Sequence, residues 1–148
     1  MLDQPEFSRW LEAADDEARV AHDLVTTGAF NATVLHAEQA AQLALKGLLR
    51  GVGAAREAWG HSISQLADRA AEVAGLAIGD ELAGRLAVLE RDYKPSRYPD
   101  ALVSGTPRGN YTREDTDRAL QTCAEVRDVV VEAWAALTDA AGGSHDDG

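Results

Sequence analysis

Apolar side chains recur every three or four residues along most of this chain, which is the spacing of one face of an α-helix. The first such run lies near the N-terminus, where Asp3 and Glu6 have the spacing of a capping box around Pro5. The pattern predicts a first helix from about Pro5 to Thr27, which Gly28 ends. Its apolar positions are Phe7, Trp10, Leu11, Ala14, Ala18, Ala21 and Val25.

The second run is apolar around much of its circumference. It begins after Phe30 and ends at Gly51. A helix of this kind needs neighbours on more than one side, so we place it at the centre of a bundle or at a contact between subunits. Because Leu43, Leu45 and Leu48 cannot all face one bundle interior, the sequence also predicts a homodimer.

Two shorter helices are predicted after a loop from Gly51 to Gly60. Ser62 can cap the first, whose core face comprises Ile63, Leu66, Ala67, Ala70 and Val73. Asp80 can cap the second, whose apolar stripe comprises Leu82, Leu86, Leu89 and Tyr93. Pro95 ends this helix, because the residue before a proline avoids the α conformation.

The connection from Lys94 to Tyr111 contains further prolines and glycines, and it is longer than the about two to eight residues usual between bundle helices. Thr112 and Asp115 can cap the last helix, and residues 142–148 form a predicted disordered acidic tail. The sequence therefore predicts one all-α domain over residues 1–141. Its architecture is an up-and-down bundle of about five helices with a long loop before the last one.

The formal net charge is −11 and the pI is near 4.6. This balance argues against binding of duplex DNA, because phosphate contacts need clustered Lys and Arg. A local contact with a nucleotide or RNA is still compatible with it. Basic residues and tyrosines gather in one stretch, where function should be sought: Arg91, Tyr93, Lys94, Arg97, Tyr98, Arg108, Tyr111 and Arg113.

Other classes of function have little support in the sequence. Cys123 is the single cysteine and reads as a small core residue, which fits a reducing cytoplasm. The first nine residues lack the apolar region of a secretory signal, and no window approaches the roughly 18 apolar residues of a membrane span. His22 and His36 have no partner at zinc-site spacing, and phosphate-binding glycine motifs are absent, so we expect no metal and no cofactor.

The predicted ligand-binding residues of this loop are Lys94, Arg97, Tyr98 and Asp100. Arg97 presents a planar guanidinium that can hold a phosphate, with Lys94 adding charge. Tyr98 can stack on a base, whereas Tyr93 continues a helical stripe and is expected to place its ring in the core. An alternative for Arg97 is an ion pair with Asp100 that fixes the shape of the loop.

Four segments in this order resemble the HEPN domain: HAEQAAQLALKGLL from His36 to Leu49, His61 in GHSISQL, the loop RDYKPSRYPDA, and Tyr111 before the last helix. The tetrapeptide RYPD is the most specific of these elements. The resemblance implies a helical bundle that is usually a homodimer, often works beside a minimal nucleotidyltransferase and is suspected of binding nucleotides. Gln42 departs from it, since relatives often have glutamate there.

Some HEPN relatives are ribonucleases, which carry an arginine and a histidine four to six residues apart. Arg97 is followed by no histidine until His145, so the literal match is Arg56 with His61 in REAWGH. The leading hypothesis is therefore a dimeric HEPN module that binds a nucleotide or a partner protein without its own catalysis. The alternative is a metal-independent, toxin-type ribonuclease that uses Arg56 and His61.

Overall fold

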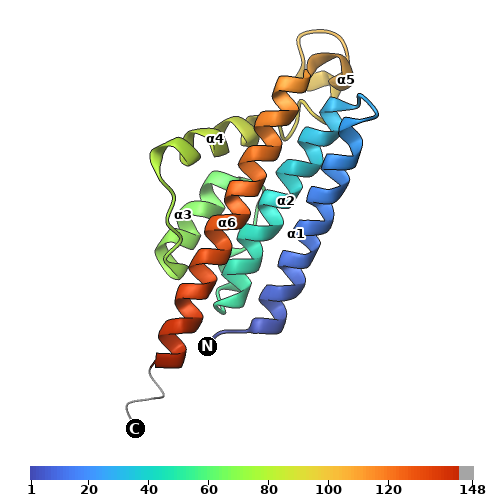
Figure 1. Cartoon of the computed structure of the whole chain (residues 1–148). Helices are drawn as coiled ribbons and strands as arrows, with labels where there is room; N and C mark the ends of the chain where they lie inside the picture. The colour runs from blue at the N-terminus through green and yellow to red at the C-terminus, as the bar shows by residue number, and fades with distance from the viewer. Residues whose placement is uncertain (144–148) are drawn as a thin grey trace.

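The computed structural model describes residues 1–143, which form six α-helices and two short 3₁₀ turns and contain no strand. Figure 1 shows the long helices side by side, with the shorter ones packed against them. The predicted all-α bundle is confirmed. No helix in residues 1–143 is both long and apolar enough to span a membrane. The helices are α1 (Gln4–Val25), α2 (Phe30–Gly51), α3 (Ile63–Ala74), α4 (Asp80–Arg91), α5 (Pro107–Asn110) and α6 (Arg113–Gly143).

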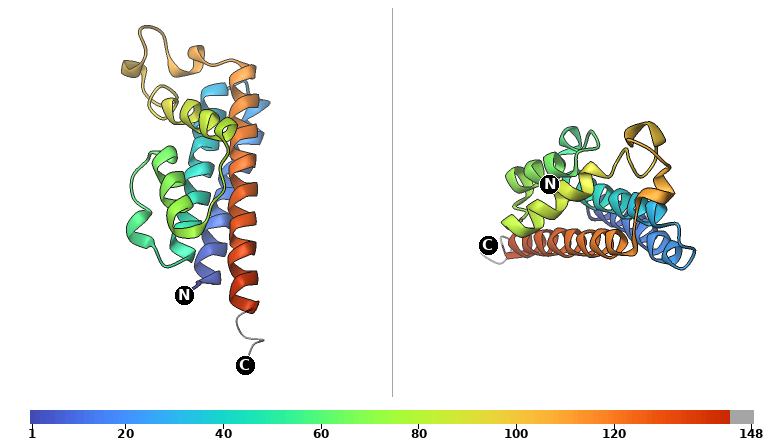
Figure 2. Two further views of the ribbon diagram at one scale, coloured as in Figure 1. Left: turned by 90° about the vertical axis from the view of Figure 1, so that its left-hand side faces the viewer. Right: turned by 90° about the horizontal axis from the view of Figure 1, so that it is seen from above.

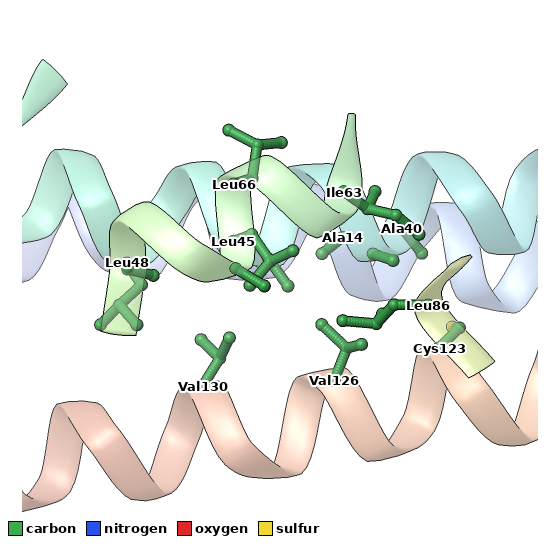
Figure 3. Packing of buried hydrophobic residues seen from close by; sticks show 14 of the residues in the cluster. Ala14, Ala40, Leu45, Leu48, Ile63, Leu66, Leu86, Cys123, Val126 and Val130 are labelled. Atoms are coloured by element: carbon green, nitrogen blue, oxygen red, sulfur yellow. The ribbon is translucent and has the colours of Figure 1, made fainter. Parts of the chain in front are cut away.

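Helix α2 is the central element, and it packs against α1, α6 and α3 (Figure 2). Leu45 and Leu48 are fully buried, and Figure 3 shows them in the space between α2 and α6, where Val130 of α6 points toward them. These leucines therefore do not require a second subunit, because one chain covers Leu45 and Leu48, and Leu43 is already partly buried. The homodimer itself stays a prediction.

Two glycines let α2 approach its neighbours closely. A Cβ atom on Gly47 would lie 2.7 Å from the Cβ of Trp10 on α1. A Cβ on Gly51 would lie 2.7 Å from the Trp134 ring of α6. That ring stacks on Phe7 of α1 with centroids 4.2 Å apart, so one aromatic pair joins α1 to α6 beside α2.

The predicted capping residues are confirmed at three helices. The Asp3 carboxylate accepts a hydrogen bond from the backbone N–H of Glu6 at 3.0 Å, and Ser62 caps α3 in the same way. At α6, Thr112 and Asp115 form a reciprocal pair: each side chain accepts from the backbone N–H of the other. These bonds satisfy N–H groups that have no partner within their own helix.

Other predicted details differ in the structure. Gly79 is the N-cap of α4 and Asp80 its first residue. Val73 is 45% exposed, because the buried face of α3 contains Ala70 and Ala74, which are four residues apart, and does not contain Val73. The loop over residues 94–111 contains the 3₁₀ turn Pro99–Ala101 and the short helix α5, rather than irregular backbone throughout. Residues 142 and 143 of the predicted tail continue α6, and residues 144–148 lie outside the described part.

Candidate functional site

A shallow groove opens where the start of α3 meets the end of α4 and the loop that follows it. Figure 2 shows α4 next to α3, and the loop that follows α4 at one end of the bundle. The groove has a volume of about 590 Å³. It contains four of the residues singled out from the sequence, namely His61, Arg91, Tyr93 and Lys94. Its walls are formed by His61, Ser62, Gln65, Glu90, Arg91, Tyr93 and Lys94.

Tyr93 provides the aromatic wall of this groove. The His61 ring stacks on it with centroids 5.0 Å apart and an interplanar angle of 22°. The Arg97 guanidinium also lies over the ring, 4.2 Å from its centroid. The expectation that the ring belongs to the core is therefore wrong. Helix α4 ends at Arg91, so Tyr93 lies beyond the apolar face of that helix and lines the groove.

Arg97 does not pair with Asp100, so that sequence interpretation is also wrong. Its guanidinium donates to the backbone carbonyl of Tyr93 at 2.6 Å and lies 3.5 Å from the Glu38 carboxylate of α2. The Arg97 side chain is 15% exposed. The backbone N–H groups of Arg97 and Tyr98 both donate to the carbonyl of Lys94, and this turn directs Arg97 inward while Asp100 faces solvent.

A buried polar chain runs behind the groove. The Glu38 carboxylate is fully buried and accepts a hydrogen bond from the Gln42 side-chain amide. The carbonyl oxygen of that amide lies 3.3 Å from Nδ1 of His61. Burial raises the pKa of Glu38, and the hydrogen bond from Gln42 and the charge of Arg97 oppose that rise.

The sequence analysis missed Glu38. The available signal was an acidic residue alone in the apolar run of α2, four residues before Gln42 and so on the same helix face. A carboxylate at such a position is rarely left without a partner. Its partner, Arg97, lies in a distant loop, and no local spacing indicates that pair.

Three of the predicted ligand-binding residues line a second hollow next to the groove. Lys94, Tyr98 and Asp100 surround it together with Ala101, and its volume is about 470 Å³. Tyr98 is 52% exposed, and Lys94 also borders the groove. Arg97, the fourth predicted residue, stands behind both hollows and lines neither.

The ends of the loop are tied to the bundle. The Tyr111 hydroxyl donates to the Asp92 carboxylate at 2.9 Å, and the Asn31 side chain of α2 donates to the carbonyl of Ser96 at 3.2 Å. Burial raises the pKa of both Tyr111 and Asp92 above their ordinary values. These contacts fix the backbone that carries Tyr93 and Lys94.

The two residues of the ribonuclease alternative are not joined in the structure. Arg56 lies on the exposed 3₁₀ turn Ala55–Glu57, and His61 lies at the groove. Within residues 1–143 no hydrogen bond connects them, and the His61 contacts are with Gln42 and Tyr93.

Arg91 and Lys94 differ in their surroundings from most cations of the chain. Within residues 1–143, neither forms an ion pair with a carboxylate, and both line the groove. Most other arginines do form such pairs: Arg9, Arg19, Arg50, Arg69, Arg85, Arg97, Arg118 and Arg127.

The fold and the site define a small helical-bundle domain with a polar groove at one end. A sequence model described as HEPN domain matches residues 7–134, and the chain belongs to the HEPN family. A comparison with curated proteins gave no match.

Solved structures of similar proteins support the fold. The crystal structure of TT1696 from Thermus thermophilus is 34% identical with a TM-score of 0.80, covering 86% of this chain and 97% of the other. ST0689, an archaeal HEPN homologue, is 28% identical with a TM-score of 0.69, covering 85% and 95%. A HEPN domain protein from Thermotoga maritima is 24% identical with a TM-score of 0.66, covering 86% and 98%, and it supports the fold alone.

Proposed function

We propose that this HEPN domain binds a nucleotide, free or within single-stranded RNA, in the groove formed by α3, α4 and the following loop. The observation that carries the proposal is the placement of Arg91 and Lys94. They line one groove without a carboxylate partner in residues 1–143, in a chain whose formal net charge is −11.

Electrostatics favour a small anion at this place over an extended one. The acidic surface repels a long polyphosphate chain, whereas Arg91 and Lys94, which line the same groove, attract a single phosphate group locally. Lys94 supplies a point charge and Arg91 a planar fork with two parallel donors. A groove of about 590 Å³ falls in the size range of small-molecule sites.

The aromatic groups suit the remaining part of a nucleotide. Tyr98 is more than half exposed beside Lys94, and an exposed ring of this kind can stack on a base, which contributes about 1–3 kcal/mol. Tyr93 already has His61 and Arg97 over its ring, so it forms a wall of the site. Arg97 has a positioning role in this proposal, because its guanidinium is engaged by Glu38 and the Tyr93 carbonyl.

Binding without catalysis explains these contacts better than the ribonuclease alternative does. Cleavage would require Arg56 and His61 to act on one phosphate, and the described structure has no contact between them. Incubation of RNA with the wild type, Arg56→Ala and His61→Ala in the presence of a chelator tests the alternative. Cleavage that both substitutions abolish would establish it.

The oligomeric and partner assignments remain proposals that follow from the family. HEPN domains commonly form dimers, and we extend that state to this chain. A minimal nucleotidyltransferase is the proposed protein partner, to which a nucleotide-binding module would present substrate.

Calorimetric titration with AMP, ATP, GTP and a short RNA tests the proposed function. We expect binding by the wild type, and a loss of at least about tenfold in Lys94→Ala and Arg91→Ala, because each removes a charge-assisted phosphate contact. Arg19→Ala is the matched control, since it removes the same charge from an exposed ion pair on α1. No binding of any of these ligands by the wild type would contradict the proposal.

A further inference from the structure

The polar chain behind the groove is costly to bury, which suggests that it has a role beyond stability. Glu38 is 0% and Gln42 is 3% exposed, and both lie on the central helix among alanine and leucine side chains. Apolar residues of similar volume would pack there without desolvating a charge. This series of hydrogen-bonded side chains ends at His61, an exposed residue that lines the groove.

The placement of the Gln42 side-chain amide gives the direction of the hydrogen bonds between these side chains. Its NH₂ group donates to the Glu38 carboxyl group, which also lies 3.5 Å from the Arg97 guanidinium. The carbonyl oxygen of the same amide then faces Nδ1 of His61, so Nδ1 must carry the proton.

A neutral histidine with its proton on Nδ1 has a free lone pair on Nε2. Nδ1 is held against the buried Gln42, and stacking on Tyr93 fixes the plane of the ring. The remaining ring nitrogen therefore belongs to the exposed edge of His61, which lines the groove. The contacts with Gln42 and Tyr93 thus orient Nε2 of His61, a hydrogen-bond acceptor, toward a ligand in the groove.

We propose that Nε2 of His61 accepts a hydrogen bond from the 2′-hydroxyl of the bound nucleotide, so that the groove selects ribonucleotides over 2′-deoxyribonucleotides. The inference rests on the proposed function. It follows from the order of groups in a nucleotide: with the phosphate at Arg91 and Lys94, the next donors along the molecule are the ribose hydroxyls. A base N–H group is the competing donor, and the test separates the two.

The first measurement concerns the free protein and needs no ligand. Nitrogen-15 NMR of histidine-labelled protein at pH 8 distinguishes the two neutral tautomers, and we expect the Nδ1–H form for His61. Gln42→Leu should abolish this preference. Gln39→Leu is the matched control, because Gln39 also donates to Glu38 but does not contact His61. An Nε2–H tautomer in the wild type would overturn the proposal.

The second measurement compares AMP, 2′-dAMP and purine riboside monophosphate, which lacks the exocyclic amine, by calorimetry. We expect AMP and the riboside to bind alike, and 2′-dAMP to bind roughly three- to tenfold more weakly, as expected for the loss of one hydrogen bond. In His61→Phe the ratio should fall to about one. Phenylalanine keeps a ring to stack on Tyr93, and because His61 is exposed this variant should fold even if Gln42→Leu does not.

Each remaining outcome counts against a specific claim. Equal binding of AMP and 2′-dAMP by the wild type would overturn the hydroxyl assignment and leave the proposed function standing. If only the purine riboside monophosphate binds more weakly than AMP, the donor is the base amine. That result would also overturn the hydroxyl assignment. No binding of any nucleotide would contradict the proposed function itself, whatever tautomer NMR assigns to His61.

Discussion

At the scale of single residues, Glu38 links the core of the bundle to the groove. Its carboxylate has no access to solvent, yet Arg97 from the loop and Gln42 from the same helix both contact it. Removal of either partner would leave a buried charge partly uncompensated, which is a large cost in proteins. The position of the loop over the groove therefore depends on one acidic side chain of α2.

The raised pKa of Glu38 predicts a pH dependence of stability. Burial, the largest cause, makes the folded state hold this proton more tightly than the unfolded state, whose reference value is 4.5. The contribution to stability is complete below that value and is lost as pH rises through the folded pKa. The melting temperature of the wild type minus that of Glu38→Gln should therefore fall as pH rises above about 4.5. A constant or increasing difference in thermal melts would contradict this prediction.

Cys123 gives a second prediction at this scale. Burial, with a smaller effect from the Asp15 charge, raises the pKa of its thiol to about 11, which agrees with the predicted core position. Alkylation by iodoacetamide at pH 8 should be slow in the native protein, because the thiolate is the reactive form. In urea the same thiol should react quickly. Fast modification of the native protein at pH 8 would show that the thiol is accessible.

At the scale of helices, close approach and intrinsic propensity make opposite predictions for two glycines. Gly47→Ala should destabilise the protein by about 1–3 kcal/mol, because its Cβ would lie 2.7 Å from Trp10. Gly84→Ala on α4 has no heavy atom within 4 Å and should stabilise it by about 0.5–1 kcal/mol. Urea unfolding measures both free energies. Stabilisation by Gly47→Ala would mean that α1 and α2 separate easily.

The helices themselves could be predicted from the sequence because their signals are local. Capping at Asp3, Ser62 and Thr112 involves partners three residues away, and the apolar period is visible within each segment. The site could be predicted only in part. Asp100, a neighbour in sequence, was the alternative partner predicted for Arg97, but in the folded chain Arg97 lies beside Glu38 on a distant helix.

At the scale of the whole molecule, the acidic surface and the basic groove predict a salt response. Binding of a nucleotide at Arg91 and Lys94 should weaken as salt rises, because both cations are exposed and ions screen them. Stability should respond less, since core burial dominates it. Calorimetry and thermal melts over one salt series test this contrast. Nucleotide affinity that does not change with salt would place binding away from these two cations.

A homodimer is expected from the family and from the surface features of one face. Trp10, Ala13 and Leu43 line a shallow hollow between α1 and α2, with apolar groups that a second copy would cover. Light scattering at micromolar concentration should give twice the mass of 15.8 kDa. Leu43→Glu should shift the protein toward monomer, because it places a charge in that contact.

Val73→Glu is the control for that experiment, since it adds the same charge to an exposed apolar position on α3. If it dissociates the dimer and Leu43→Glu does not, the interface lies on the α3 side of the bundle. If both variants leave the dimer intact, neither face is the interface. A monomer mass for the wild type over the whole dilution series would show that the protein does not dimerise. Each groove would then have to bind its ligand within a single chain.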